Sequence, residues 1–443
     1  MTRRIITALL NLILRIFFRR VEVAGLERVP KNRAVIFVLN HPNGLVDPLF
    51  ILCFAPRPVS LLGKSTLFKM PVIGWLARAL DTLPVYRQQD KGEDVSRNRE
   101  TFQKCRELLE RGGSLALFPE GVSHSEPSLR PLKTGAARIA LGAASAGMQK
   151  ELVIVPAGLY YTAKAKFRSA ALLYFGAPIP VPPVPLDETA EPPREAARAL
   201  SDQLDAALRQ VTLNADQKQA LGLVAQAEEI FNSVHTKEPS LAAELQLKRR
   251  FIEGYEFYRT HEPEKLAAIE ARIRRYGEQL RMVGLGVDDL SAATRATPGK
   301  ASFRLLQFLL SLPFALVGAV LHYPAYRLTG LIAKRLSRND DDVVSTIKVL
   351  ASALFFPLTW LLCAAVCLWQ WSWLMVLAAL LCLPLLGFIA MRFAEDLDET
   401  LGAAKAILFF LTRNYFAKRL LAERKAIREE ILTLQEGLLK AGE

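Results

Sequence analysis

The chain has 443 residues, enough for two or three domains, and 51% of them are hydrophobic. Its formal net charge of +13 indicates an anionic partner, either a membrane surface or a nucleic acid. We expect anionic membrane lipids and no nucleic acid, because the sequence has no zinc-finger spacing, RNA-binding aromatic motif or basic heptad region.

The five cysteines, Cys53, Cys105, Cys363, Cys367 and Cys382, form no metal-ligand or disulfide pattern. We interpret them as small hydrophobic residues of a protein in a reducing compartment.

Residues 1–20 have the hydrophobic periodicity of an amphipathic helix. Arg4, Arg15 and Arg19 fall on one stripe, and apolar side chains cover the rest. Arg15 interrupts the apolar run and no cleavage site follows, so a signal peptide is disfavoured. We predict a helix that lies in the membrane interface, and the alternative is a helix packed on its own domain.

A histidine and an aspartate flank a turn after the first buried strand. Residues 34–39 are an apolar, β-branched run, followed by His41, a Pro-Asn-Gly turn and Asp47. A carboxylate that takes the proton on one imidazole nitrogen leaves the other nitrogen free to act as a general base. A loop histidine beside a helix-capping aspartate is the alternative, and taken alone the pair fits it better.

Three further sequence blocks favour the catalytic interpretation of His41 and Asp47. Residues 83–87 end at Arg87, residues 115–123 carry the sequence Phe-Pro-Glu-Gly-Val-Ser with Glu120 and Gly121, and residues 153–158 form an apolar strand that ends at a proline. With the Asn-His…Asp block these resemble, in order and spacing, the four blocks of the glycerolipid acyltransferase (PlsC-like) family. The resemblance covers roughly the first 190 residues.

One feature departs from most of that family, because five residues rather than four separate His41 from Asp47. The longer spacing is similar to that of the fungal glycerol-3-phosphate and dihydroxyacetone-phosphate acyltransferases. Gly44 can adopt a left-handed conformation and accommodate the extra residue.

The resemblance implies an α/β acyltransferase domain, a central sheet flanked by helices, in which His41 and Asp47 are catalytic. Glu120 and Gly121 are implied to bind the phosphorylated glycerol acceptor. Arg87 can hold a phosphate by forked hydrogen bonds, and Lys133 is a further candidate contact. The alternative for Arg87 is a solvated surface arginine. No metal and no cofactor are required.

The rest of the chain reads as helical. A proline-rich segment at 177–194 is predicted to close a domain of residues 21–190, and residues 195–300 read as a charged helical region. Residues 303–391 contain three stretches near the length of a membrane span, at 303–323, 349–368 and 373–389, and residues 392–443 form a helical tail.

The positions of charge and tryptophan predict one membrane hairpin. Basic residues, Arg338 among them, follow the first apolar stretch and the last one, which favours the cytoplasm for both. Pro313 and Pro324 allow the first stretch not to cross. Trp369, Trp371 and Trp373 suit the far interface, so we expect the hairpin tip at 370–372.

We therefore expect a membrane-bound O-acyltransferase that moves an acyl group from acyl-CoA or acyl-carrier protein to glycerol 3-phosphate or 1-acylglycerol 3-phosphate. In a bacterium it would lie in the inner membrane, with its catalytic domain facing the cytoplasm. The alternatives are a lysophospholipid acyltransferase with another acceptor and a non-catalytic membrane scaffold of the same fold.

Overall fold

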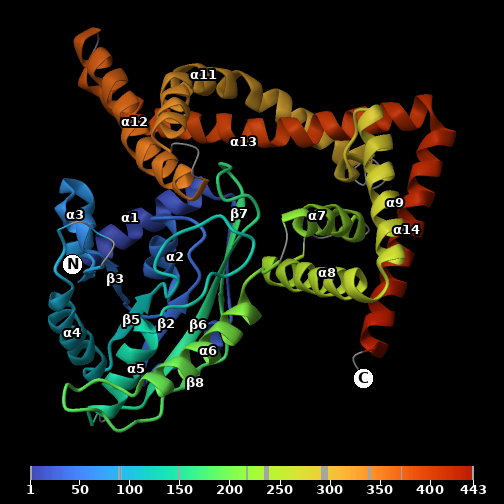
Figure 1. Cartoon of the computed structure of the whole chain (residues 1–443). Coiled ribbons are helices and arrows are strands. Elements are labelled where there is room, and N and C mark those ends of the chain that lie inside the picture. The colour runs from blue at the N-terminus through green and yellow to red at the C-terminus, as the bar shows by residue number, and fades with distance from the viewer. Residues whose placement is uncertain are drawn as a thin grey trace. The chain divides into compact units, whose positions relative to one another are not determined.

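The computed structural model describes residues 2–87, 90, 92–147, 150–215, 218–233, 239–290, 298–337, 341–370 and 372–441 (Figure 1). Arg338 and Trp371, which entered the topology prediction, lie outside these residues. The chain forms two compact units. Unit 1 comprises Met1–Asn214, Ser240–Leu245 and Leu336–Val349, and unit 2 comprises Ala215–Pro239, Gln246–Arg335 and Leu350–Glu443.

A mixed sheet is the centre of unit 1, with strand order β1-β7-β6-β2-β5-β3-β4 and β8 paired to β6. Strand β2 pairs in parallel with β5 and β6, and β3 pairs in parallel with β4 and β5. Strands β7 and β8 run antiparallel to β6. The strands are β1 (Arg20–Ala24), β2 (Ala34–Leu39), β3 (Ser60–Lys64), β4 (Leu83–Val85), β5 (Ser114–Leu117), β6 (Leu152–Tyr161), β7 (Ala170–Phe175) and β8 (Ile179–Pro180).

Helices cover both faces of this sheet, as the predicted fold class requires (Figure 1). The helices of unit 1 are α1 (Thr2–Phe17), α2 (Val46–Phe54), α3 (Pro71–Ala79), α4 (Asn98–Glu110), α5 (Gly135–Ser145) and α6 (Arg194–Val211), with short 3₁₀ turns at Leu26–Arg28, Ser65–Lys69 and Val95–Arg97.

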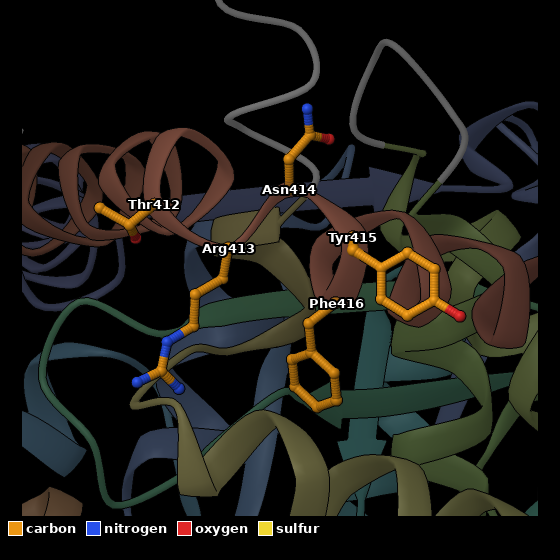
Figure 2. A pocket seen from close by; sticks show the side chains of 5 residues that line it. All are labelled: Thr412, Arg413, Asn414, Tyr415 and Phe416. Carbon is orange, nitrogen blue, oxygen red and sulfur yellow. The ribbon is translucent and has the colours of Figure 1, made fainter.

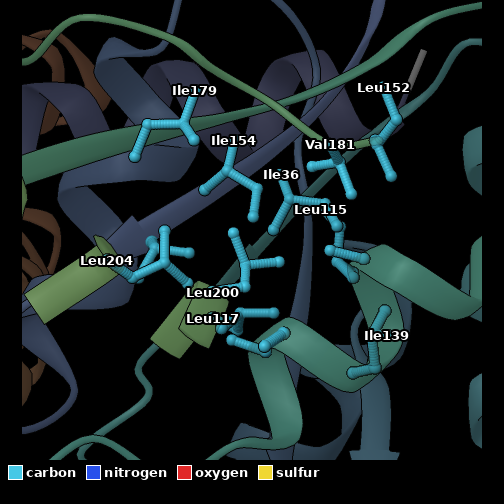
Figure 3. Packing of buried hydrophobic residues seen from close by; sticks show 14 of the residues in the cluster. Ile36, Leu115, Leu117, Ile139, Leu152, Ile154, Ile179, Val181, Leu200 and Leu204 are labelled. Carbon is cyan, nitrogen blue, oxygen red and sulfur yellow. The ribbon is translucent and has the colours of Figure 1, made fainter. Parts of the chain in front are cut away.

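All six residues of β2 are buried, because its two faces contact two different cores. Ile36 and Val38 pack with residues of α4, α5 and α6, whereas Phe37 and Leu39 pack with α1 and α2. Figure 3 shows the first of these cores, in which side chains of the sheet and of α6 lie together. Helix α6 therefore belongs to unit 1, so the compact unit extends beyond the boundary predicted at residue 190.

The N-terminal helix α1 has two apolar surfaces. Leu14 and Phe17 are buried in the second core, together with Phe18 just after the helix. Ile5, Leu9, Leu12 and Ile16 remain exposed along a separate stripe. The helix is thus docked on its own domain and still presents an unpaired apolar stripe.

Unit 2 is helical. Its helices are α7 (Lys218–Asn232), most of α8 (Leu241–His261), α9 (Pro263–Met282), most of α11 (Pro298–Leu336), most of α12 (Asp341–Gln370), α13 (Trp373–Thr412) and α14 (Asn414–Ala441). Arg272 of α9 forms ion pairs with Glu423 and Glu430 of α14, at 2.7 and 2.6 Å, which join these two helices.

Among the residues that the structure describes, three helices are long and apolar enough to cross a membrane: Leu306–Leu336, Val343–Gln370 and Trp373–Thr412. His322 of α11 ties two of them together, because Trp360 Nε1 of α12 donates to His322 Nε2 at 2.8 Å. The other ring nitrogen of His322 then carries the proton and donates to the Gly318 carbonyl at 2.8 Å.

Candidate active site

The candidate site lies where parallel strands end. His41 follows β2, the Phe118–Gly121 turn follows β5, and Arg87 follows β4. Strands β2 and β5 are neighbours in register, with Val38 opposite Leu117, so the segments after them emerge side by side. Crevices outside the carboxyl ends of parallel strands are where ligands of open α/β sheets bind.

His41 and Asp47 form a hydrogen-bonded pair. The distance from His41 Nδ1 to Asp47 Oδ2 is 2.8 Å, and the Asp47 side chain is fully buried. The His41 ring stacks on Phe118 with centroids 4.2 Å apart, and 17% of its side chain is exposed. Within the part of the chain that the structure describes, Nε2 of His41 makes no hydrogen bond, which is the arrangement of a general base.

Asp47 is held by two further donors. The backbone N–H of Asn43 donates to Oδ2 at 2.7 Å, and the Tyr161 hydroxyl donates to Oδ1 at 2.6 Å. Burial, and after it the charge of Asp47, raises the pKa of Tyr161 well above its ordinary value. The phenol therefore stays protonated at neutral pH and keeps donating to the carboxylate.

A second carboxylate–histidine pair fixes the backbone of His41. Glu120 Oε1 accepts from the His41 N–H at 2.9 Å, and Glu120 Oε2 accepts from the Arg130 N–H at 2.9 Å. Oε2 also bonds His124 Nε2, and the His124 N–H donates to the His41 carbonyl at 3.1 Å. Because His124 Nδ1 accepts from the Glu126 N–H, the proton sits on Nε2.

Two cationic side chains flank Gly121. Arg87 Nη1 donates to the Gly121 carbonyl at 2.5 Å. Lys133 Nζ lies 2.6 Å from where a Cβ on Gly121 would stand, and Gly121 has a φ of +75°. A side chain at position 121 would therefore be strained and would displace Lys133.

Asp90 orients Arg87. Its carboxylate accepts from Arg87 Nε at 3.2 Å and from Lys64 Nζ at 3.1 Å. Burial works to raise the pKa of Asp90, but the hydrogen bonds from Arg87 and Lys64 outweigh it and leave that pKa below its ordinary value. The remaining N–H groups of Arg87 are available to an anionic ligand.

A pocket of about 440 Å³ lies in unit 2, where α13 meets α14 (Figure 2). Its lining residues are Thr412, Arg413, Asn414, Tyr415 and Phe416. None of them is a histidine or a carboxylate, the two groups that make up the His41–Asp47 pair. Among the described residues no group of histidines, cysteines and carboxylates could hold a metal ion.

Comparison with known proteins agrees with this geometry. Residues 20–160 match the family model described as acyltransferase. The chain therefore carries an acyltransferase domain. Residues 223–438 match a second model, the glycerol-3-phosphate acyltransferase 2 C-terminal domain. The family predicted from the sequence motifs is confirmed.

Several curated acyltransferases are similar to this chain. Glycerol-3-phosphate O-acyltransferase 1 of Saccharomyces cerevisiae is 25% identical over 81% of this chain and 60% of its own length. Glycerol-3-phosphate O-acyltransferase 2 of the same yeast is 30% identical over 59% of this chain and 37% of its own. An uncharacterized acyltransferase of Schizosaccharomyces pombe is 25% identical over 81% of this chain and 67% of its own length. The chain thus spans about two thirds or less of these relatives.

Among solved structures, the 1-acyl-sn-glycerophosphate acyltransferase PlsC of Thermotoga maritima is similar at 20% identity with a TM-score of 0.34. That likeness covers 47% of this chain and 79% of PlsC.

The acyltransferase domain brings together the predicted site residues in two groups. His41 and Asp47 form the acid–base pair, and the cationic side chains of Arg87 and Lys133 lie together beside Gly121. Glu120 differs from expectation: its side chain is fully buried, and its oxygens are taken by His41, His124 and Arg130. A carboxylate would also repel a phosphate, so the contacts of Glu120 favour a role in holding His41.

Sequence reasoning missed Tyr161 and Asp90, and it placed His124 near the site without its contacts to Glu120 and His41. Tyr161 was missed because the third apolar strand was predicted to end near Pro156, whereas β6 continues to Tyr161. Pro156 is tolerated because its carbonyl accepts from Gly176 at the junction of β8 and β7. The N and C=O groups of one strand residue point to the same neighbouring strand. Because the Pro156 carbonyl points away from β2, its missing N–H also lies on that side, and no hydrogen bond to β2 is lost.

Proposed function

We propose that the acyltransferase domain transfers a fatty acyl group from an acyl thioester to the hydroxyl of a glycerol phosphate. The observation that carries the proposal is the His41–Asp47 pair, open at Nε2, at the same sheet edge as the cations Arg87 and Lys133. The names of the relatives support a glycerolipid acceptor.

In this mechanism His41 Nε2 takes the proton of the acceptor hydroxyl as its oxygen attacks the thioester carbonyl. The C–S bond then breaks, and the imidazolium returns the proton to the leaving thiolate. Asp47 holds the Nδ1–H and stabilises the imidazolium, as carboxylates do in other histidine pairs. Arg87 and Lys133 bind the acceptor phosphate, and Glu120 with His124 fixes the backbone of His41.

The acceptor we propose is glycerol 3-phosphate or 1-acylglycerol 3-phosphate, and the donor is acyl-CoA or acyl-carrier protein. A panel test with purified full chain and one labelled acyl-CoA separates the candidates. We expect label in glycerol 3-phosphate or its monoacyl form and none in a choline lysophospholipid, because its phosphate is a diester that carries a quaternary ammonium, which Arg87 and Lys133 would repel. Transfer to the choline acceptor alone would contradict this assignment.

The exposed stripe of α1 supports the proposal that this helix lies in an anionic membrane surface. Ile5, Leu9, Leu12 and Ile16 are each about half exposed, and Arg4 and Arg15 are on the same helix. A fluorophore on Leu9→Cys in a cysteine-free chain should be quenched by brominated lipids, whereas one on Arg111→Cys beyond α4 should not. Equal quenching at both positions would contradict the proposal.

A further inference from the structure

The first turns of α12 belong to the acyltransferase unit. The segment Leu336–Val349 lies in unit 1, although the helix continues into the candidate span Val343–Gln370. Ser345 is fully buried, Thr346 is 8% exposed, and Val349 joins the same core as Phe37 of β2. Burial of two hydroxyl side chains requires that they find hydrogen-bond partners.

Those partners lie in and beside the loop that separates His41 from Asp47. The backbone N–H of Leu45 donates to Thr346 Oγ1 at 3.1 Å, and Leu45 directly precedes α2, which carries Asp47. The Ser345 hydroxyl donates to the Lys164 carbonyl, and Lys348 Nζ donates to the Ala165 carbonyl at 2.7 Å.

The side chain of Lys164 in turn contacts the loop between His41 and Asp47. Its Nζ donates to the Pro42 carbonyl at 2.8 Å and to Ser125 Oγ at 2.6 Å. The start of α12 therefore contacts the loop twice, at Leu45 directly and at Pro42 through Lys164. Between these points stands Gly44, with a φ of +43°.

We propose that Thr346 is a positioning residue for the His41–Asp47 pair, so that the start of a membrane helix completes the active site. The inference rests on the proposed function. An acid–base pair works only when its geometry is held within about half an ångström, and a loop containing glycine does not supply that rigidity alone. Thr346 accepts the N–H of Leu45 and so fixes the backbone two residues before Asp47.

The test compares Thr346→Val, Thr346→Ser and wild type as full chains in lipid nanodiscs, with labelled acyl-CoA and glycerol 3-phosphate. Valine keeps the shape and removes the acceptor oxygen, which leaves the part-buried N–H of Leu45 without this partner. We expect kcat to fall roughly tenfold with an unchanged KM for the acceptor, because one lost hydrogen bond loosens the backbone before Asp47. Serine keeps the hydroxyl and should restore most of kcat.

The matched control is Thr359→Val, 13 positions further along the same helix, whose hydroxyl donates to the Phe355 carbonyl. It should keep wild-type kinetics. Wild-type kcat in Thr346→Val, or equal losses in the Val and Ser variants, would overturn the inference. His41→Ala is measured beside them: if it is inactive while Thr346→Val is normal, only this inference fails, and if it is active, the proposed mechanism fails as well.

Discussion

Asp47 is tightly held in the candidate site, because three donors converge on its two oxygens. Tyr161 supplies one of them, at 2.6 Å. We predict that Tyr161→Phe lowers kcat about tenfold, the usual effect of losing one hydrogen bond to a buried charge. A pH profile of the wild type tests whether Tyr161 stays protonated. Because the pKa of Tyr161 is raised, ionisation of the phenol should cause no loss of activity up to about pH 9. Unchanged turnover in the phenylalanine variant would remove Tyr161 from the site.

The residues that hold the pair could not be predicted as the pair itself was. His41 and Asp47 are six positions apart beside a strand and a turn, so local pattern places them together. Tyr161 is 114 positions from Asp47, and Thr346 is 301 positions from Leu45. Contacts at such separations depend on strand order and on helix docking, which the pattern of a single sequence does not contain.

Arg87 lies on the acceptor side of the site rather than at the reacting atoms. We predict that Arg87→Ala raises the KM for glycerol 3-phosphate about tenfold or more, since it removes a charged contact to phosphate, and changes kcat little. Arg99→Ala, at an exposed position of α4, is the matched control for loss of one positive charge. An unchanged KM in Arg87→Ala would place Arg87 among the surface arginines.

At the scale of elements, the strands and helices of the domain were largely predictable and their partners were not. The buried run predicted at residues 34–39 became β2 with the same bounds. Helix α6 was assigned to a separate helical region because its charged face dominates the sequence. Its apolar face, with Leu200 and Leu204, is nevertheless buried in the core of unit 1.

The contact between α6 and β6 gives a stability prediction. A Cβ on Gly158 would stand 1.8 Å from the Val211 carbonyl oxygen, so no side chain fits there without moving α6. Gly158→Ala should destabilise the domain by about 1–3 kcal/mol, measured by thermal unfolding. Gly142→Ala in α5 meets nothing within 4 Å and should be neutral or slightly stabilising, since glycine disfavours helix. Equal stability of the two variants would refute the packing of α6.

At the scale of the whole molecule, connectivity limits how the chain crosses a membrane. The start of α12 belongs to the acyltransferase unit, and α14 is tied to α9 by Arg272. No candidate span occurs among the described residues before α11. If these regions share one side, α12 and α13 cross as a hairpin and α11 does not cross. Pro313 and Pro324 inside α11 are consistent with a bent, interfacial helix.

This topology predicts the labelling of two single cysteines in a background without the native ones. Leu336→Cys, at a position 63% exposed, should resist a membrane-impermeant thiol reagent in intact cells. Ser372→Cys, between α12 and α13, should react. Labelling of Leu336→Cys before the cells are opened would restore a crossing by α11.

The most direct test of the account is acyl transfer by His41→Ala. Purified wild type and variant, both as full chains in nanodiscs, are given labelled acyl-CoA and the acceptor that the wild type prefers. Loss of the general base should lower kcat by about 10²–10⁴-fold. The far-UV circular dichroism should stay unchanged, because His41 lies at a strand end and is partly exposed. Turnover within a few fold of the wild type would contradict the His41–Asp47 mechanism.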